Sequence, residues 1–347
     1  MGCAGILAMP NTKPPVSKVL KSDPADGWSI EDYLDMLRAA GGDAFDDIIV
    51  PLYLTASTTP AMIAAGAKSG LLRAAKYYPP HGTTGAEFGA PLAQHMHNGV
   101  IRALADHGVV LCLHGEEHGL PPERYFGRTQ NAEELFYREQ MPPLVEKFPD
   151  LKIVCEHVTT KTAVRFVQEC GDHVAATITP QHLMYTAGHL LQGLKYHLYC
   201  LPLVKFDEDR QALRKAVSAP GNTKFFAGTD SAPHVKKMTA CGCAAGCYTG
   251  GIAPQLYAQA FEMAGVDLAV KKGRDAFERF LCHIGPGFYG LKKQTATFRL
   301  EKTPSIVSKR DVADGAADGV AYGQIVPLPI GMGDGSDTAT IPWSIRP

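Results

Sequence analysis

Short hydrophobic runs recur along the chain, and each is followed by a longer segment in which hydrophobic positions repeat with helical period. Such short runs are typical of buried strands, whereas the longer repeat is typical of amphipathic helices. The predicted strands are Gly5–Met9, Asp47–Leu54, Leu72–Tyr77, Val109–Leu113, Leu151–Glu156, Val174–Thr179 and Lys224–Gly228. The predicted helices are Ile30–Ala40, Pro91–His107, Ala132–Lys147, Thr162–Glu169, Asp209–Ser218, Pro254–Met263 and Arg274–Cys282. This order predicts a series of βα units.

About seven βα units in series favour a TIM-type (β/α)8 barrel over a doubly wound sheet. No predicted strand is followed by the Gly-x-Gly-x-x-Gly pattern of dinucleotide-binding folds. We assign residues 1–291 to the barrel. Residues 292–347 are rich in Gly, Asp and Thr and poor in periodic hydrophobic positions, so we expect a C-terminal extension that packs on the barrel.

Composition narrows the possible partners. The 347 residues include 34 Lys and Arg against 35 Asp and Glu, so no net basic field is available for nucleic acid or an anionic membrane surface. The longest apolar runs are far shorter than the roughly 20 residues of a membrane span. Nine cysteines, an odd number thinly scattered, are typical of reduced thiols. We therefore expect a cytoplasmic protein that acts on a small molecule.

Reactive side chains stand at the ends of several predicted strands. In a parallel barrel these ends face one mouth, where catalytic groups gather. The residues at these ends are Asn11, Lys76, His114, His157 and Asp230. Each alone has an ordinary structural explanation, such as a hydrogen-bonded histidine or a helix-capping aspartate, and only the set indicates a site.

The chemistry of the set indicates a metal-dependent hydrolase. Imidazole and carboxylate ligands suit Zn²⁺, which can activate water near neutral pH. An ammonium repels a cation, so Lys76 fits this set only after reaction with CO₂. The resulting carbamate is an anionic ligand that can bridge two metal ions.

Longer motifs surround these residues. They are Ala74-Ala75-Lys76 with Tyr78-Pro79, Leu113-His114-Gly115-Glu116, Glu156-His157-Val158-Thr159-Thr160-Lys161, Ala176-Thr177-Ile178-Thr179-Pro180-Gln181-His182-Leu183-Met184, His197-Leu198-Tyr199-Cys200-Leu201-Pro202 and Gly228-Thr229-Asp230-Ser231-Ala232-Pro233-His234. In this order they resemble the dihydroorotases of the short bacterial type, in the amidohydrolase superfamily. The resemblance runs from about Gly5 to the Trp343-Ser344-Ile345 ending.

The resemblance implies an enzyme of pyrimidine biosynthesis, a homodimer with two zinc ions per subunit. Such an enzyme interconverts N-carbamoyl-L-aspartate and L-dihydroorotate through attack of a metal-bound hydroxide on a cyclic amide. The resemblance also implies the ligands: carboxylated Lys76 as the bridge, His114 and His157 on one zinc, and Asp230 on the other zinc and as general acid/base. The implied substrate contacts are Asn11, Thr83, Thr84, Leu201, His234 and Ala244, with Thr83 and Thr84 on a closing loop.

One part of the family pattern has no counterpart in this sequence. The first barrel strand of the family ends in Asp-x-His-x-His-x-Arg, which completes the second zinc site and binds the substrate carboxylate. Here Met1 falls where the second strand of the family begins, so we expect a barrel without its first strand. Either the gene encodes a longer protein or this is a shortened homologue that has lost the two-metal centre. In both cases we expect little activity from these 347 residues alone.

Two other clusters invite a metal-site interpretation. His95 and His97 form the only His-x-His pair, but they lie in a predicted helix, where side chains two apart point to different faces. Cys241, Cys243 and Cys247 lack a fourth ligand at suitable spacing, and the resemblance implies that they belong to a loop beside the substrate. His182 lies within a family motif, and we expect it to support the site without binding metal.

Three functional hypotheses remain. The first is a dihydroorotase. The second is a non-catalytic dihydroorotase-like protein that has lost the two-metal centre and serves as a binding partner. The third is a related amidase acting on another cyclic amide such as a hydantoin. The retained Lys76, His114, His157 and Asp230 favour the first.

Overall fold

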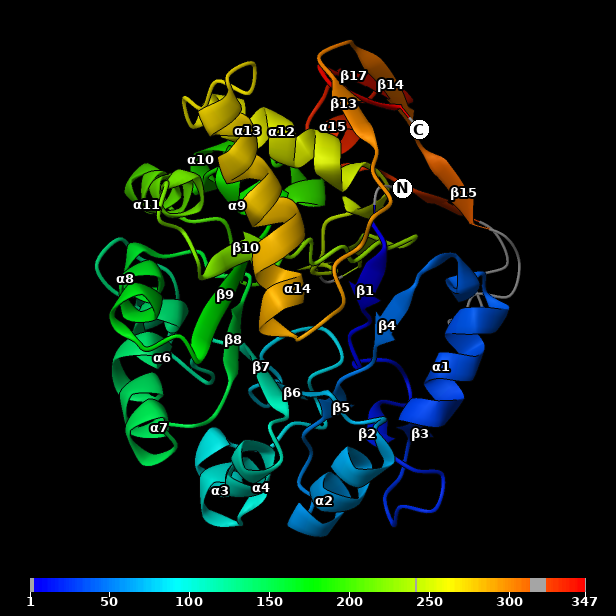
Figure 1. The fold of residues 1–347 in the computed structure, drawn as a ribbon. Coiled ribbons are helices and arrows are strands. Elements are labelled where there is room, and N and C mark those ends of the chain that lie inside the picture. Colours follow the sequence, from blue (N-terminus) through cyan, green and yellow to red (C-terminus); the bar gives the residue numbers. More distant parts are fainter. Residues whose placement is uncertain (1–2, 241, 313–322, 347) are drawn as a thin grey trace. The chain divides into compact units, whose positions relative to one another are not determined.

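The computed structural model describes residues 3–240, 242–312 and 323–346, in two compact units (Figure 1). The N-terminal unit comprises Cys3–Glu156 and Arg165–Ala176. The C-terminal unit comprises His157–Val164 and the described residues from Thr177 onward. Helix α8 (Lys161–Glu169) and strand β9 (Val174–Ile178) each begin in one unit and end in the other.

A parallel sheet runs through the strands that the hydrophobic pattern predicts. Its six strands follow the order β10-β9-β8-β7-β6-β5, which is the reverse of the chain order. The strands of the N-terminal unit are β1 (Gly5–Leu7), β2 (Val16–Lys18), β3 (Trp28–Ser29), β4 (Asp47–Ile49), β5 (Leu52–Tyr53), β6 (Ala74–Tyr77), β7 (Val110–His114) and β8 (Ile153–Glu156). Consecutive neighbours with βα connections confirm the predicted α/β class.

The predicted strand Asp47–Leu54 is wrong as a single element. It divides into β4 and β5 at Val50-Pro51, since proline has no backbone N–H to donate to a ladder. Strand β4 pairs in parallel with β1, and β5 pairs in parallel with β6. One extended segment thus connects β1 to the six-stranded sheet.

Helices of the N-terminal unit begin and end at recognisable signals. They are α1 (Ile30–Ala39), α2 (Pro60–Ser69), α3 (Leu92–His97), α4 (Val100–Asp106), α5 (Pro122–Tyr125), α6 (Ala132–Glu139) and α7 (Met141–Lys147), with a 3₁₀ turn at Gly42–Ala44. Helix α2 has Thr59 as its N-cap, Pro60 in its first turn and Gly70 at its end. Helices α2 and α4 lie side by side (Figure 1).

Two predicted helices are each a pair. The prediction Pro91–His107 is interrupted at Gly99, whose φ of 85° is outside the helical region. The prediction Ala132–Lys147 divides at Gln140, immediately before the Met141-Pro142-Pro143 run that starts α7. Proline cannot continue the preceding helix because it lacks the N–H and clashes with the turn before it.

The C-terminal unit contains the last sheet strand, several helices and a strand-rich tail. The elements before the tail are α9 (Pro180–Met184), α10 (Ala187–Leu191), a 3₁₀ turn at Tyr196–Leu198, α11 (Asp207–Ser218), β10 (Phe225–Ala227), β11 (Met238–Thr239), β12 (Gly242–Cys243), a 3₁₀ turn at Gly250–Ile252, α12 (Ala253–Met263), α13 (Lys271–Glu278), a π-helical turn at Arg279–His283 and α14 (Ile284–Phe288). The predicted helix Arg274–Cys282 therefore spans the end of α13 and part of the π-helical turn.

The tail forms nested antiparallel pairs that the hydrophobic pattern did not predict. Its elements are β13 (Arg299–Glu301), β14 (Ser305–Ser308), β15 (Arg310–Val312), β16 (Gly323–Ile325), α15 (Leu328–Gly331), β17 (Thr338–Ile341) and β18 (Ser344–Arg346). Strand β13 pairs with β18, β14 with β17 and β15 with β16. The Trp343 indole N–H donates to Glu262 of α12 at 3.0 Å, which ties the tail to the helices of its own unit.

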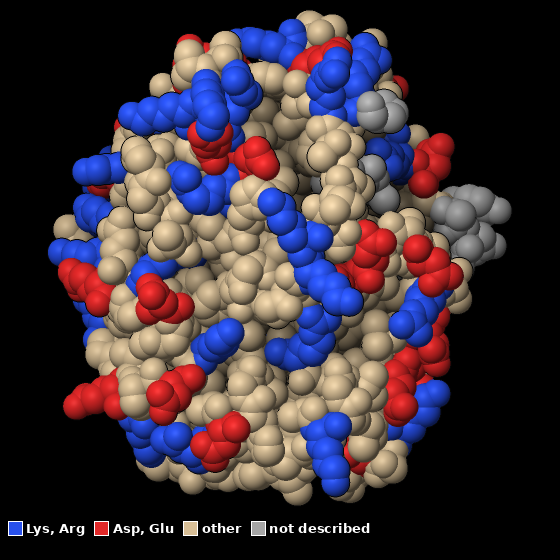
Figure 2. Space-filling view, viewed as in Figure 1, with Lys and Arg blue, Asp and Glu red and all other residues tan. Residues whose placement is uncertain are grey.

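The surface carries both charge signs. Figure 2 shows Lys and Arg interspersed with Asp and Glu, as the net charge of -1 predicts. Within the described residues, no helix has both the length and the hydropathy to cross a membrane.

Candidate functional site

Lys76 and His114 lie on adjacent strands of the N-terminal unit. In the parallel register of β6 and β7, Lys76 faces Cys112, and His114 ends β7 two residues later. His114 in turn faces Glu156, the last residue of β8. Both side chains are 1 % exposed. The predicted position of these two residues at strand ends is confirmed.

Lys76 is buried beside an aromatic ring. Its Nζ lies 5.0 Å from the centre of the Tyr78 ring. Among the described residues, no carboxylate forms an ion pair with it. The carbamate at Lys76 stays a prediction from the sequence.

His114 is oriented by a carboxylate and an aromatic ring. Its Nε2 and Glu116 Oε2 are 2.9 Å apart, and both side chains are buried. The Tyr78 ring centre lies 6.3 Å from that of His114. A metal-binding imidazole commonly donates its other ring N–H to a carboxylate, which fixes the tautomer and the ring plane. Glu116 fits this orienting role.

Asn11 and the Thr83-Thr84 loop, both predicted to contact substrate, meet directly. Asn11 Nδ2 donates to the Thr84 carbonyl at 3.0 Å, across 73 residues of sequence. Gly85 follows with φ of +73°, and a Cβ there would lie 2.7 Å from the Asn11 carbonyl oxygen. Tyr53 supports the same loop, since its hydroxyl donates to the Gly85 carbonyl at 3.2 Å. The loop therefore rests on Asn11 and Tyr53.

His157 and Asp230, in the C-terminal unit, both have left-handed backbone conformations. Their φ angles are 42° and 43°, and each follows a sheet strand, β8 or β10. Non-glycine residues rarely adopt this region, and where they do, the surrounding structure must hold them there. Such strain is concentrated at functional sites, so it supports both predictions.

Thr177 holds these two strand ends. Its Oγ1 accepts a hydrogen bond from the His157 backbone N–H at 2.7 Å. A Cβ on Gly228 would lie 2.5 Å from the Thr177 Cβ, so only glycine allows the chain before Asp230 to approach this closely. Thr177 thus contacts the backbone on both sides of the strand to which it belongs.

The remaining predicted substrate contacts lie on loops of the C-terminal unit. His234 Nε2 donates to the Ala245 carbonyl at 2.9 Å, which brings His234 beside Ala244. The Gly246 N–H donates to the Tyr199 carbonyl at 2.9 Å, two residues before Leu201. Backbone hydrogen bonds therefore connect the segments of Leu201, His234 and Ala244.

His182 supports this region, as the sequence indicated. Its ring is buried, and Nε2 donates to the Pro202 carbonyl at 2.9 Å. With Nε2 as the donor, Nδ1 accepts from the Thr179 hydroxyl, which is 2.8 Å away. Both ring nitrogens are used within the fold, which explains why His182 is not a metal-ligand candidate.

The described members of the two alternative metal clusters have separate surroundings. His95 is buried and His97 is exposed, as expected for side chains two apart on a helix. Cys243 and Cys247 donate to different carbonyls, those of Tyr196 and His197. Cys241 lies outside the described residues. Within the described part of the chain, no three His, Cys, Asp or Glu side chains are grouped to hold a metal ion.

Comparison with known proteins gives the family. No family model matches the chain. A dihydroorotase of Shewanella amazonensis is 40% identical over 307 residues, which cover 86% of this chain and 81% of that protein. A dihydroorotase of a Picosynechococcus species is 41% identical over 308 residues, covering 87% and 82%. The chain belongs to the dihydroorotase family.

A solved structure extends this similarity to the fold. Dihydroorotase from Saccharomyces cerevisiae, crystallised with 5-fluoroorotic acid, has a TM-score of 0.81 at 25% identity. The superposition covers 99% of this chain and 90% of that one. The resemblance to dihydroorotases that the motifs indicated is thus confirmed.

Tyr78 and Thr177 contact candidate site residues but had no role assigned from the sequence. Both lie inside motifs shared with the dihydroorotase family, so the motifs themselves were the signal. Their roles depend on contacts with residues distant in sequence: Tyr78 with His114, and Thr177 with His157 and Gly228. Periodicity alone does not reveal such contacts.

Proposed function

We propose that the protein is a dihydroorotase that reversibly cyclises N-carbamoyl-L-aspartate to L-dihydroorotate. The observation that carries this proposal is the similarity to dihydroorotases over 86% of the chain. Burial of Lys76 and His114 at strand ends and left-handed backbone at His157 and Asp230 support it. In the hydrolytic direction, water adds to the ring carbonyl carbon and the ring C–N bond breaks.

The donor set fits zinc. We propose Lys76, as a carbamate, His114, His157 and Asp230 as its ligands, as the family resemblance implies. Two zinc ions per subunit is the family expectation. When bound, zinc polarises a carbonyl oxygen and lowers the pKa of water.

We propose Asp230 as the group that transfers the proton. Asp230 is half-buried and held at the end of β10 by the tight packing of Gly228 on Thr177. In this proposal its carboxylate takes a proton from the attacking water and delivers it to the ring nitrogen as the C–N bond breaks. A positioned carboxylate that accepts and returns one proton serves both directions of a reversible reaction.

Asn11, His234 and the loop of Thr83 and Thr84 are proposed to bind the substrate carboxylate and exclude water. An amide nitrogen carries two N–H groups, so Asn11 can donate to Thr84 and to a substrate oxygen at once. This contact makes loop position and substrate binding interdependent. The backbone of Leu201 and Ala244 is proposed to contact the ring.

The finer architecture is also a proposal. Strand β1, the segment of β4 and β5, and strands β6 to β10 would be strands two to eight of a TIM-type (β/α)8 barrel within residues 1–291. The Trp343 to Glu262 hydrogen bond supports residues 292–347 as an extension packed on the barrel. We further propose a cytoplasmic homodimer; free thiols at all eight described cysteines agree with a reducing compartment.

Substrate discrimination tests the function. The protein expressed from its complete gene and supplied with zinc is assayed with L-dihydroorotate and, separately, with hydantoin, while bound zinc is measured by elemental analysis. We expect hydrolysis of dihydroorotate with zinc bound. Turnover of hydantoin alone would indicate a different cyclic amidase, and zinc binding without turnover of either would indicate a non-catalytic homologue.

A further inference from the structure

A lysine in the C-terminal unit is buried against three backbone carbonyls. Lys237 is 6% exposed. Its Nζ donates to the carbonyl oxygens of Tyr199 at 2.7 Å, Ala244 at 2.6 Å and Gly246 at 2.5 Å. An ammonium has three N–H donors, so each donor has one acceptor.

These carbonyls belong to two separate segments. Tyr199 lies two residues before Leu201, whereas Ala244 and Gly246 follow the hairpin of β11 and β12. The Ala244 N–H also donates to the Lys237 carbonyl at 2.8 Å. Lys237 therefore binds the Ala244 segment through both its backbone and its side chain, and it ties that segment to Tyr199.

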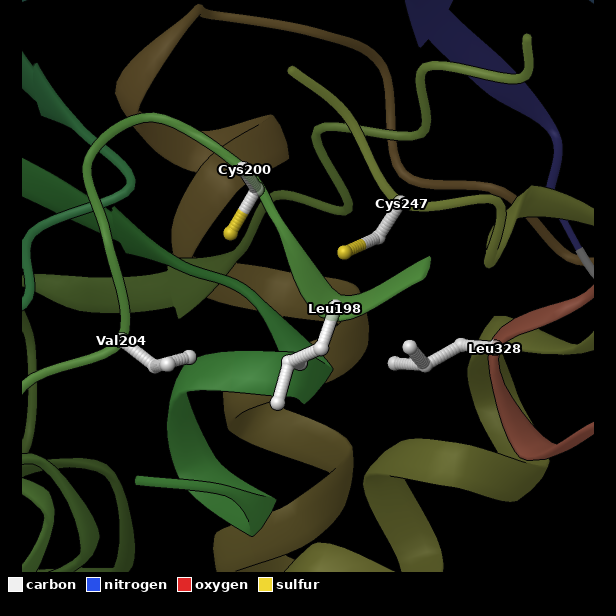
Figure 3. Packing of buried hydrophobic residues seen from close by; sticks show 5 residues of the cluster. All are labelled: Leu198, Cys200, Val204, Cys247 and Leu328. Atoms are coloured by element: carbon white, nitrogen blue, oxygen red, sulfur yellow. The ribbon is translucent and has the colours of Figure 1, made fainter. Parts of the chain in front are cut away.

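An apolar cluster lies beside this contact. It consists of Leu198, Cys200, Val204, Cys247 and Leu328, all buried. Figure 3 shows the thiols of Cys200 and Cys247, neighbours in sequence of Tyr199 and Gly246, next to each other in this cluster. Burial lowers the pKa of Lys237, while the thiols of Cys247, Cys243 and Cys200 act in the opposite direction. The apolar surroundings strengthen hydrogen bonds from the ammonium.

Leu201 is fixed from both sides. Lys237 holds the Tyr199 carbonyl, and His182 Nε2 holds the Pro202 carbonyl at 2.9 Å. Backbone groups between two such anchors have little freedom to move. The Ala244 segment has its own anchors, Lys237 and the hydrogen bond from His234 to Ala245.

We propose that Lys237 is a positioning residue that holds the Leu201 and Ala244 backbone segments in the arrangement that binds the substrate ring. This inference rests on the proposed function, because those two segments are the proposed ring contacts. Charge-assisted hydrogen bonds are shorter and stronger than neutral ones, so one side chain suffices to fix both loops. Lys237 does not contact the reacting atoms in this scheme.

The test compares Lys237→Met with Lys236→Met. Lys236 is exposed and adjacent, so it is a matched control for removal of one positive charge. For Lys237→Met we expect the KM for L-dihydroorotate to rise at least about tenfold with kcat changed less than about threefold, since only binding geometry is lost. Lys236→Met should keep the wild-type KM.

Hydrogen exchange gives a readout that does not require turnover. Peptides covering residues 238–249 should exchange faster in Lys237→Met than in wild type, because the Ala244 and Gly246 amides lose their support. Peptides covering β14 and β17, elsewhere in the same unit, should be unchanged. If the wild-type protein, expressed from its complete gene, has no dihydroorotase activity, the proposed function fails while this exchange measurement still tests the anchoring.

Lys237→Gln extends the test to a milder change, because its amide keeps two of the donors. We expect partial recovery of KM and of protection in residues 238–249 relative to Lys237→Met. If Lys237→Met does not fold, Lys237→Gln against Lys236→Gln decides by the same two measurements. A folded Lys237 variant with wild-type KM and wild-type exchange in residues 238–249 would overturn the proposal.

Discussion

The two regions that supply the proposed site residues are built differently. In the N-terminal unit, Lys76 and His114 are part of sheet strands, and burial in the sheet fixes them. In the C-terminal unit, His234 and Ala244 lie on loops after β10, and the side chains of His234 and Lys237 bind the backbone of these loops. The strand region is held mainly by its place in a buried sheet, whereas these loops depend on individual hydrogen bonds. Different substitutions should therefore disrupt each region.

The largest expected effect is in the strand region, at Lys76. Lys76→Met should lower kcat by about three orders of magnitude with loss of bound zinc, because the proposed carbamate ligand is removed. The thermal midpoint of the metal-free protein should stay within about 5 °C of wild type, since an apolar chain replaces a buried charge. Steady-state kinetics, elemental analysis and calorimetry measure the three quantities. Lys68→Met, at an exposed position, is the control, and retention of zinc by Lys76→Met would contradict the assignment.

A pH effect on stability is expected at His95, on helix α3, which packs beside Tyr77 of strand β6. His95 is fully buried beside Tyr77, and neither ring nitrogen has a hydrogen-bond partner among the described residues. Burial lowers the pKa of His95 to about 4. Below about pH 6.5 the unfolded chain binds a proton at His95, whereas the folded protein binds it only near pH 4. The free energy of unfolding therefore falls as the pH drops from about 6.5 towards 4.

His95→Leu should remove that part of the pH dependence. Between pH 7 and pH 5, wild type should lose about 2 kcal/mol more of its free energy of unfolding than the variant does. Urea unfolding at both pH values measures the difference. His107→Leu, at an exposed histidine, should keep the wild-type pH dependence. An identical pH dependence in wild type and His95→Leu would show that His95 is not held neutral.

Thr177→Val tests the hydrogen bond that supports the backbone where strand β8 ends at His157. The substitution preserves shape but removes the acceptor of the His157 N–H. The free energy of unfolding should fall by about 1–2 kcal/mol, because a buried donor is left unsatisfied. Urea titration measures this loss, and Thr239→Val, at an exposed position, is the control. An unchanged stability would mean that Thr177 does not support the left-handed backbone of His157.

The smallest expected effect on stability is at Asn11. Asn11→Ala removes an exposed hydrogen bond to Thr84, so the free energy of unfolding should change by less than about 0.5 kcal/mol. The KM for dihydroorotate should nevertheless rise several-fold, because loop and substrate share this side chain. Lys13→Ala, which removes only an exposed ion pair with Glu87, should leave KM unchanged. Equal KM values for both variants would exclude the proposed role of Asn11.

The strand region was predictable from sequence to a greater degree than the loop region. Hydrophobic runs precede Lys76 and His114, and they predict strands β6 and β7. The same runs predict that both residues lie at or near the ends of these strands. By contrast, the Lys237 to Tyr199 contact joins residues 38 apart, and nothing local in Val235-Lys236-Lys237 distinguishes one lysine from the other. The nested tail strands are short and pair over long separations, so periodicity gave no signal for them. The local hydrophobic pattern predicts helices and strands. The hydrogen bonds that join distant loops are seen only in the tertiary structure.

The central claim is that the loop region supplies a carboxylate, Asp230, that moves the proton in dihydroorotate hydrolysis. The most direct measurement is the turnover of L-dihydroorotate by Asp230→Ala, expressed from the complete gene and compared with wild type under identical zinc loading. We expect turnover to be abolished while the circular dichroism spectrum and thermal midpoint remain those of a folded protein. Retained turnover in a folded Asp230→Ala protein would contradict it.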